Sequence, residues 1–197
     1  MEYRTCHHPQ ALPLWHHGRM FLVPTKNWEW ICTLNQEKYQ VPLCSVQEKN
    51  ALLQSAQENL FQLVQLSFEN KKNLIQNFFN DLKKYQTHLS GLLPHNLNEK
   101  EWQNTFDFLE NCLKQENNEN NDQNKHEQKI ILLMPSLENP LLDFIQNFIF
   151  HFFKNNAVIL KPHLKFSAFF LALAELTNLF PQDALQVLLG EDFLLKE

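Results

Sequence analysis

A chain of 197 residues is long enough for one domain with a substantial core. Hydrophobic residues make up 44% of it, which favours a folded chain over an intrinsically disordered one. The net charge of -5, counted with the histidines neutral, supplies no basic face and argues against a nucleic-acid partner.

The sequence carries no signal for export or membrane insertion. Its first residues lack the basic segment, apolar stretch and small-residue cleavage site of a secretory signal. The longest apolar stretches, 144–153 and 166–173, are too short for a bilayer. We therefore expect a cytoplasmic chain with no membrane partner. The cysteines agree with a reduced compartment, because they lack metal-type spacing: Cys6, Cys32, Cys44 and Cys112.

Short strands are predicted within the first 45 residues, which are otherwise irregular and rich in aromatic side chains. Residues 15–23 predict a strand pair that turns near Gly18. Residues 28–32 alternate in the manner of a further strand.

Helical signals follow. Residues 45–48 (Ser-Val-Gln-Glu) have the form of a capping box, and apolar residues at helical spacing come after them. Ser67 begins a second helix, for which Gly91 is a stop signal. Residues 98–101 again have the form of a capping box, ahead of a third helix over 102–113.

Residues 114–129 (KQENNENNDQNKHEQK) contain no apolar side chain. Such a segment cannot bury anything, so it is predicted to be an exposed linker. A compositional bias of the genome explains the Asn and Gln equally well.

The last third alternates short apolar runs with helical patterns. This order is typical of a parallel sheet with helices on its faces, whose strands lie side by side through right-handed crossovers. Ligands of such sheets bind beyond the carboxyl ends of the strands. The predicted strands are 130–134, 157–160 and 184–189, the helices are 141–154 and 167–179, and the strand ends are 134–138, 161–164 and 190–192. With only three glycines in the chain, no Gly-rich phosphate loop can be formed.

Three segments of this last third resemble aldehyde dehydrogenases. Residues 156–162 (NAVILKP) resemble the family segment G-N-T-V-V-L-K-P. Residues 138–142 (ENPLL) resemble the turn P-W-N-(F/Y)-P-L-L, and Pro140 precedes Lys161 by the 21 positions found in the family. Residues 180–190 (FPQDALQVLLG) resemble the strand that comes next in the family. Within this last segment Asp183, Leu185 and Gln186 lean towards the branch that oxidises glutamate semialdehyde.

The resemblance implies an α/β fold: a partial Rossmann-like parallel sheet of three strands with flanking helices, preceded by an N-terminal strand pair and a helical segment. We expect one structural domain. Residues 1–113 would hold the strand pair and helices of the NAD-binding domain, 114–129 the linker, and 130–197 a partial nucleotide-binding βαβαβ unit.

The family's cofactor is NAD or NADP, and the resemblance places its contacts at the strand ends. Lys161 takes the position of the lysine that hydrogen-bonds the ribose. An ordinary solvated lysine after a strand is an equally good interpretation. The family's next ribose contact is a glutamate, and Leu164 stands there, so one hydrogen bond worth about 0.5–1.5 kcal/mol is missing. The other positions at this edge are Pro135, Ser136, Leu137 and His163.

The resemblance assigns no catalytic residue. The family's turn donates an Asn side chain to the developing oxyanion, and Glu138 occupies that position with Asn139 beside it. A carboxylate there repels a developing negative charge. The family's cysteine nucleophile and glutamate base lie beyond the equivalent of Gly190. No sequence feature activates any of the four cysteines present.

Two groups of metal-type ligands occur near the N-terminus, at residues 6–8 (Cys-His-His) and at His16 and His17. Their spacing fits no standard zinc pattern. A flexible His-rich N-terminus is the simpler interpretation, so we predict no metal centre.

Three hypotheses follow. The first is a truncated or split aldehyde dehydrogenase, inactive alone: either a decayed gene product, or one piece that assembles with a partner chain bearing the catalytic half or, as a homo-oligomer, with copies of itself. The second is a non-catalytic interaction protein whose Phe side chains exceed what the fold can bury and so form an exposed apolar patch. The third is an unrelated α/β binding domain. The Phe residues of the second hypothesis are Phe144, Phe148, Phe152, Phe153, Phe166, Phe169 and Phe170.

Overall fold

The computed structural model describes residues 10–21, 28–94, 99–114 and 128–190. At its centre lies a five-stranded sheet in the order β3–β2–β8–β7–β6. Strands β6, β7 and β8 are parallel neighbours, as predicted, and β2 joins β8 in the antiparallel sense. The strands are β2 Leu14–His16, β3 Arg19–Phe21, β6 Ile130–Leu133, β7 Ala157–Leu160 and β8 Leu185–Val187.

A smaller sheet has the order β1–β5–β4 (β1 Gln10–Ala11, β4 Trp28–Cys32, β5 Lys38–Pro42). The sequence predicted β4 but neither β1 nor β5. Strand β5 has alternating side chains, with Tyr39 and Val41 buried. Strand β5 was not predicted because it ends at a proline, Pro42, which weakens a local strand signal.

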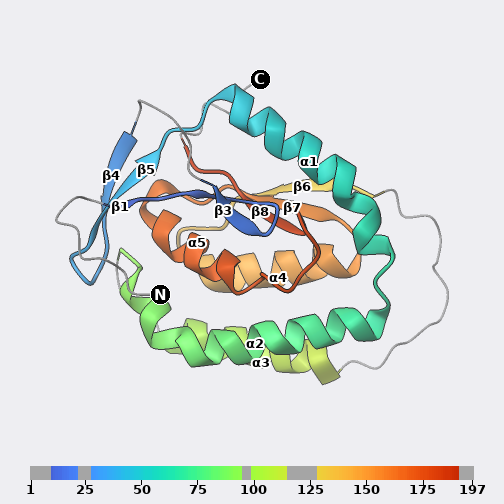
Figure 1. The fold of residues 1–197 in the computed structure, drawn as a ribbon. Helices are drawn as coiled ribbons and strands as arrows, with labels where there is room; N and C mark the ends of the chain where they lie inside the picture. The colour runs from blue at the N-terminus through green and yellow to red at the C-terminus, as the bar shows by residue number, and fades with distance from the viewer. Residues whose placement is uncertain (1–9, 22–27, 95–98, 115–127, 191–197) are drawn as a thin grey trace.

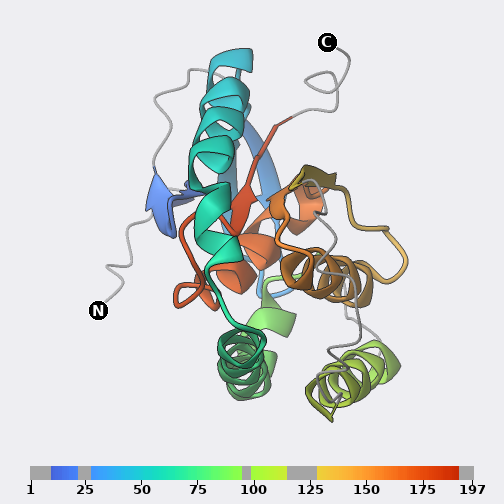
Figure 2. The same ribbon diagram turned by 90° about the vertical axis from the view of Figure 1, so that its right-hand side faces the viewer.

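Helices lie on both faces of the large sheet (Figure 1). Helix α1 covers one face, and α4 and α5 cover the other (Figure 1). Helices α2 and α3 form an outer layer that packs on α5 and α4 respectively (Figure 2). The helices are α1 Val46–Val64, α2 Phe68–Gly91, α3 Glu99–Lys114, α4 Pro140–Phe153, the 3-10 turn η1 Leu164–Phe166 and α5 Ser167–Glu175. None of the described helices is long and apolar enough to cross a membrane.

The local signals for helix ends are mostly confirmed. Ser45 and Glu48 form the predicted capping box, Ser67 caps α2, and α2 ends at Gly91. Helix α5 is shorter than the predicted 167–179, because its last residues form hydrogen-bonded turns rather than a helix. Of the segments 98–101 and 114–129, residue 98 and residues 115–127 lie outside the described part of the chain.

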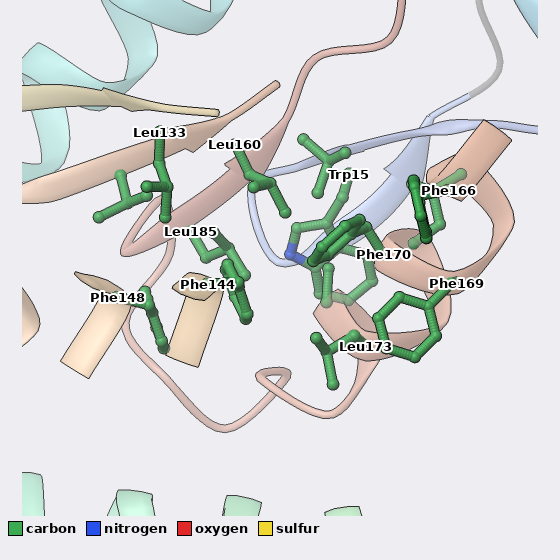
Figure 3. Packing of buried hydrophobic residues seen from close by; sticks show 14 of the residues in the cluster. Trp15, Leu133, Phe144, Phe148, Leu160, Phe166, Phe169, Phe170, Leu173 and Leu185 are labelled. Atoms are coloured by element: carbon green, nitrogen blue, oxygen red, sulfur yellow. The ribbon is translucent and has the colours of Figure 1, made fainter. Parts of the chain in front are cut away.

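The core between the large sheet and α4 and α5 is built from phenylalanine rings (Figure 3). The prediction that the Phe residues exceed the available burial is wrong. Six of the seven are at most 3% exposed, and Phe153 is partly buried against the core. The outer layer explains this result, because α2 contributes Phe78, whose ring meets Phe180 edge-on, and Phe180 in turn packs on Phe148.

Candidate functional site at the strand ends

The carboxyl ends of the three parallel strands meet at one edge of the sheet. Leu133 of β6 pairs with Leu160 of β7, so the turn that starts at Pro135 and the segment that starts at Lys161 leave neighbouring strands together. Gly190 follows β8 at the same edge, and residues 191 and 192 of the predicted strand end lie outside the described chain. This is the edge at which open parallel sheets bind ligands.

Lys161 is held at the tip of β7. Its backbone N–H donates to the Leu133 carbonyl at 2.8 Å, which extends the pairing of β7 with β6 by one residue. The residue is only 2% exposed, and Pro162 beside it is also buried. The interpretation of Lys161 as an ordinary solvated lysine is therefore wrong.

The turn after β6 is closed by its own polar groups. The Ser136 N–H donates to an Asp143 carboxylate oxygen at 2.7 Å, and the Ser136 hydroxyl accepts from the Asn139 N–H at 3.3 Å. Leu137 is 56% exposed. Glu138 and Asn139 are exposed as well, and the Asn139 side chain makes no capping bond to α4. The turn thus presents a carboxylate and an amide to solvent at the sheet edge.

A buried glutamate from another helix caps α4 instead. The Glu101 carboxylate accepts from the backbone N–H of Leu141 at 2.8 Å and from that of Leu142 at 3.3 Å. A carboxylate at this position satisfies two N–H groups of the first turn and interacts favourably with the helix dipole. Sequence analysis missed this role, because Glu101 lies on α3 and appeared only as the end of a capping-box pattern.

His163 lies exposed directly after Pro162. Its side chain accepts from the Lys165 N–H at 3.4 Å and so caps the 3-10 turn that leads into α5. Leu164, at the position of the missing glutamate, is partly buried against the core. At this position a leucine that packs on the core therefore stands where the resemblance implies a glutamate that contacts the ribose.

The two cysteine thiols with raised pKa values are suited to packing rather than to nucleophilic attack. Burial, and then the charge of Glu48, raise the pKa of Cys44 to about 12, while the Leu189 backbone and Lys161 act in the opposite direction. Burial also raises the pKa of Cys112. Nucleophilic cysteines need a lowered pKa. Cys32 is exposed on the smaller sheet, and Cys6 lies outside the described residues.

The sequence matches no family model and no curated protein. Its fold is similar to that of solved aldehyde dehydrogenases. One is assigned as a methylmalonate-semialdehyde dehydrogenase from Sinorhizobium meliloti, in complex with NAD, with a TM-score of 0.78 at 17% identity over 94% of this chain and 42% of that one. Another is the methylmalonate-semialdehyde dehydrogenase of Oceanimonas doudoroffii, with a TM-score of 0.77 at 13% identity over 95% and 43%.

The 1-pyrroline-5-carboxylate dehydrogenase of Thermus thermophilus is similar to the same degree. It gives a TM-score of 0.75 at 15% identity over 92% of this chain and 40% of its own. In each comparison nearly all of this chain is matched, against less than half of the enzyme. The chain therefore has the fold of the N-terminal portion of an aldehyde dehydrogenase.

Proposed function

We propose that the chain is an aldehyde dehydrogenase-like protein that holds the start of a NAD(P)-binding unit and does not oxidise aldehydes by itself. The observation that supports it most is the parallel trio β6–β7–β8 with Lys161 at the tip of β7. One neighbour of this fold is described in complex with NAD. The lean towards glutamate-semialdehyde oxidation stays a proposal, which rests on Asp183, Leu185 and Gln186.

The residues present fit the cofactor only in part. Lys161 would hold the ribose, and Pro135, Ser136, Leu137 and His163 would surround it at the same edge. The 2% exposure of Lys161 means that its ammonium group has to be uncovered before it can reach a ribose hydroxyl. Leu164 offers no acceptor in place of the family's glutamate. We therefore expect weak binding of NAD(P), because the lost hydrogen bond costs about 0.5–1.5 kcal/mol.

Two features support the lack of activity in the isolated chain. The pKa values of Cys44 and Cys112 are raised, so neither thiol supplies a thiolate near neutral pH. At the turn, Glu138 presents a carboxylate at the position where oxyanion stabilisation needs a donor.

A partner chain would find its place at β6. Among the strands that the structure describes, β6 is an edge of the five-stranded sheet and pairs with β7 alone. Leu132 within it and Met134 directly after it are 48% and 49% exposed. The faces of parallel sheets are normally covered by helices, so exposed apolar side chains on such a sheet are unusual. An edge strand also has unpaired backbone N–H and C=O groups, which can pair with a strand of another chain. We propose that a chain with the catalytic half, or a second copy of this chain, adds here.

Activity and cofactor binding are tested separately. The purified chain is mixed with NAD or NADP and a panel of aldehydes, and the absorbance of the reduced cofactor is followed; we expect none to form. Clear turnover would overturn the proposal of inactivity. Titration calorimetry with NAD should give weak binding that Lys161→Met abolishes and His163→Ala, at the exposed neighbour, only weakens. Light scattering after size exclusion reports self-association.

A further inference from the structure

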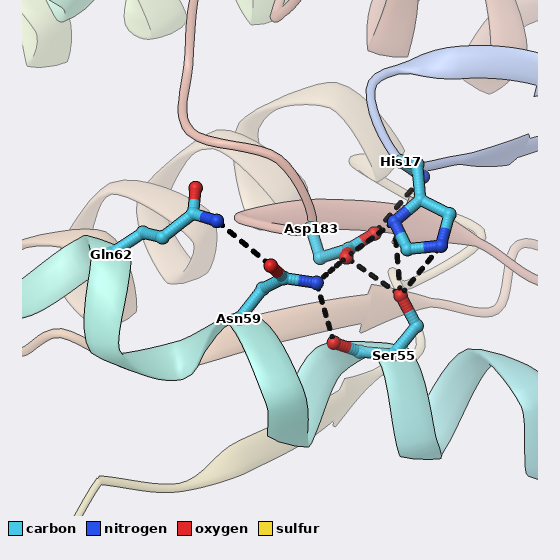
Figure 4. A network of polar contacts seen from close by, with 5 residues as sticks. All are labelled: His17, Ser55, Asn59, Gln62 and Asp183. Carbon is cyan, nitrogen blue, oxygen red and sulfur yellow. Dashed lines mark hydrogen bonds and ion pairs between the residues drawn. The ribbon is translucent and has the colours of Figure 1, made fainter.

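Three metal-type ligands from distant parts of the sequence meet beside the five-stranded sheet. The candidate ligand atoms of His16, His17 and Asp183 all lie within 4.8 Å of one another. His16 is the last residue of β2 and His17 lies in the β2–β3 turn, whereas Asp183 lies two residues before β8. Figure 4 shows His17 and Asp183 side by side. Sequence analysis considered the two histidines and found no pattern, because the third member lies 166 residues away from His17.

The backbone holds these three residues in place. His17 and Gly18 have φ angles of 52° and 66°, as the primed turn of a tight hairpin requires. Asp183 also has a positive φ, 64°, which Asp tolerates better than most residues. The His17 N–H donates to an Asp183 carboxylate oxygen at 3.0 Å and ties the two turns together.

A second layer of polar groups orients the aspartate. Its other carboxylate oxygen accepts from the Ser55 hydroxyl and from the Asn59 amide, each at 2.7 Å, and lies 2.9 Å from His17 Nδ1. Gln62 in turn donates to Asn59 at 2.8 Å (Figure 4). Carboxylates that ligate metal ions are themselves hydrogen-bonded in this way.

One polar atom of the cluster has no partner. His16 Nε2 is buried and makes no hydrogen bond within the described chain. The imidazole of His16 stacks on that of His17, with ring centroids 4.0 Å apart. A buried nitrogen of this kind calls for an explanation, and a ligand supplies one.

We infer that His16, His17 and Asp183 form a binding site for Zn²⁺, with water as the fourth ligand. Two imidazole nitrogens and one carboxylate oxygen are a ligand set that zinc favours, and three protein ligands leave one position open. Tetrahedral bonds of about 2.0–2.2 Å put ligand atoms roughly 3.4 Å apart. Atoms that now lie up to 4.8 Å apart would therefore close in by at most about 1.4 Å on binding, whereas His17 Nδ1 and the Asp183 oxygen, 2.9 Å apart, would separate by about 0.5 Å. His17 is 36% exposed, which gives the ion and the water access.

The buried carboxylate of Asp183 favours a cation at this site. Asp183 is only 1% exposed at its side chain, so its negative charge is poorly hydrated and gains from a bound cation. Arg19, which pairs with His16 across the hairpin, is the opposing charge.

Zinc binding is measured on the chelator-treated full chain by competition with a chromophoric chelator, and Co²⁺ is used as a spectroscopic probe. We expect one Zn²⁺ per chain and the visible absorption of four-coordinate cobalt. His16→Gln and Asp183→Asn keep size and polarity, and each should weaken binding at least about 10-fold, as should Asn59→Ala through the orientation of Asp183. Circular dichroism checks that each variant is folded.

The N-terminal ligands provide the control. The combined variant Cys6→Ser, His7→Ala, His8→Ala removes the other group of metal-type ligands, and binding should be unchanged in it. The inference is overturned if the intact chain binds no Zn²⁺ tighter than about 100 µM, or if the combined variant loses the ion while His16→Gln retains it.

Discussion

The cap that Glu101 places on α4 gives a sharp stability prediction. Its carboxylate is 4% exposed and accepts two backbone N–H bonds, at 2.8 Å and 3.3 Å. A hydrogen bond to a charged group is worth about 1.5–3 kcal/mol, and the longer bond adds less. Glu101→Ala should therefore lower the free energy of unfolding by about 3 kcal/mol. Glu101→Gln keeps an acceptor and loses the charge–dipole term, which leaves a loss of about 1 kcal/mol.

Urea unfolding followed by far-UV circular dichroism measures both losses. The matched control is Glu110→Ala on the same helix, where the half-exposed carboxylate makes ion pairs with the side chains of Lys83 and Lys114. Such pairs contribute about 0–1 kcal/mol. The reasoning is refuted if Glu101→Ala costs no more than Glu110→Ala, because the cap would then contribute nothing beyond a surface charge.

Three further outcomes are expected. Burial lowers the pKa of Lys71 from 10.5 to about 8, so the unfolded chain binds more protons than the folded chain between these pH values. The free energy of unfolding should therefore rise with pH in this range, by about 3 kcal/mol at most, and Lys71→Met should flatten the rise in urea titrations. Cys44, with its pKa of about 12, should resist iodoacetamide at pH 8 while the exposed Cys32 reacts, and equal labelling by mass spectrometry would contradict this. Phe148→Ala should cost about 3–5 kcal/mol in the same urea assay, against less than about 0.5 for Phe150→Ala, whose ring is 53% exposed.

Local sequence signals predicted the parts of the fold that depend on neighbouring residues. Ser45 and Ser67 begin helices because their side chains satisfy N–H groups of the first turn. The order of β6, β7 and β8 followed from the handedness of parallel crossovers, a rule that needs only the alternation of elements. The resemblance of three short segments to aldehyde dehydrogenases placed this sheet within a known fold.

Contacts between segments that are distant in the sequence could not be predicted from local sequence signals. Nothing near Asp183 in the sequence indicates that its carboxylate holds a hairpin turn, and nothing near Glu101 indicates that it caps α4. Both side chains act on elements that are distant in sequence, so no periodicity records them. The Phe prediction failed for a related reason, because the outer layer that covers those rings comes from a helix outside the βαβαβ unit.

The candidate site shows the same division. The sequence placed Lys161 after a strand, which is confirmed, but a strand end does not reveal whether the side chain is exposed. Its burial depends on how neighbouring segments pack over the tip of β7. One of these segments is the chain before α1, where Cys44 lies near enough for Lys161 to affect the pKa of its thiol.

The pairing of Trp15 with Val187 has a consequence for the order of folding during synthesis. The β2–β3 hairpin is synthesised before its partner strand β8, which is made more than 160 residues later, as the 166-residue separation of the His17–Asp183 contact indicates. Until then Trp15, which is buried in the finished sheet, has only the other strand of its own hairpin, β3, beside it. Closing so long a loop is entropically costly, so we expect the hairpin to join last and to be the element most dependent on chaperones.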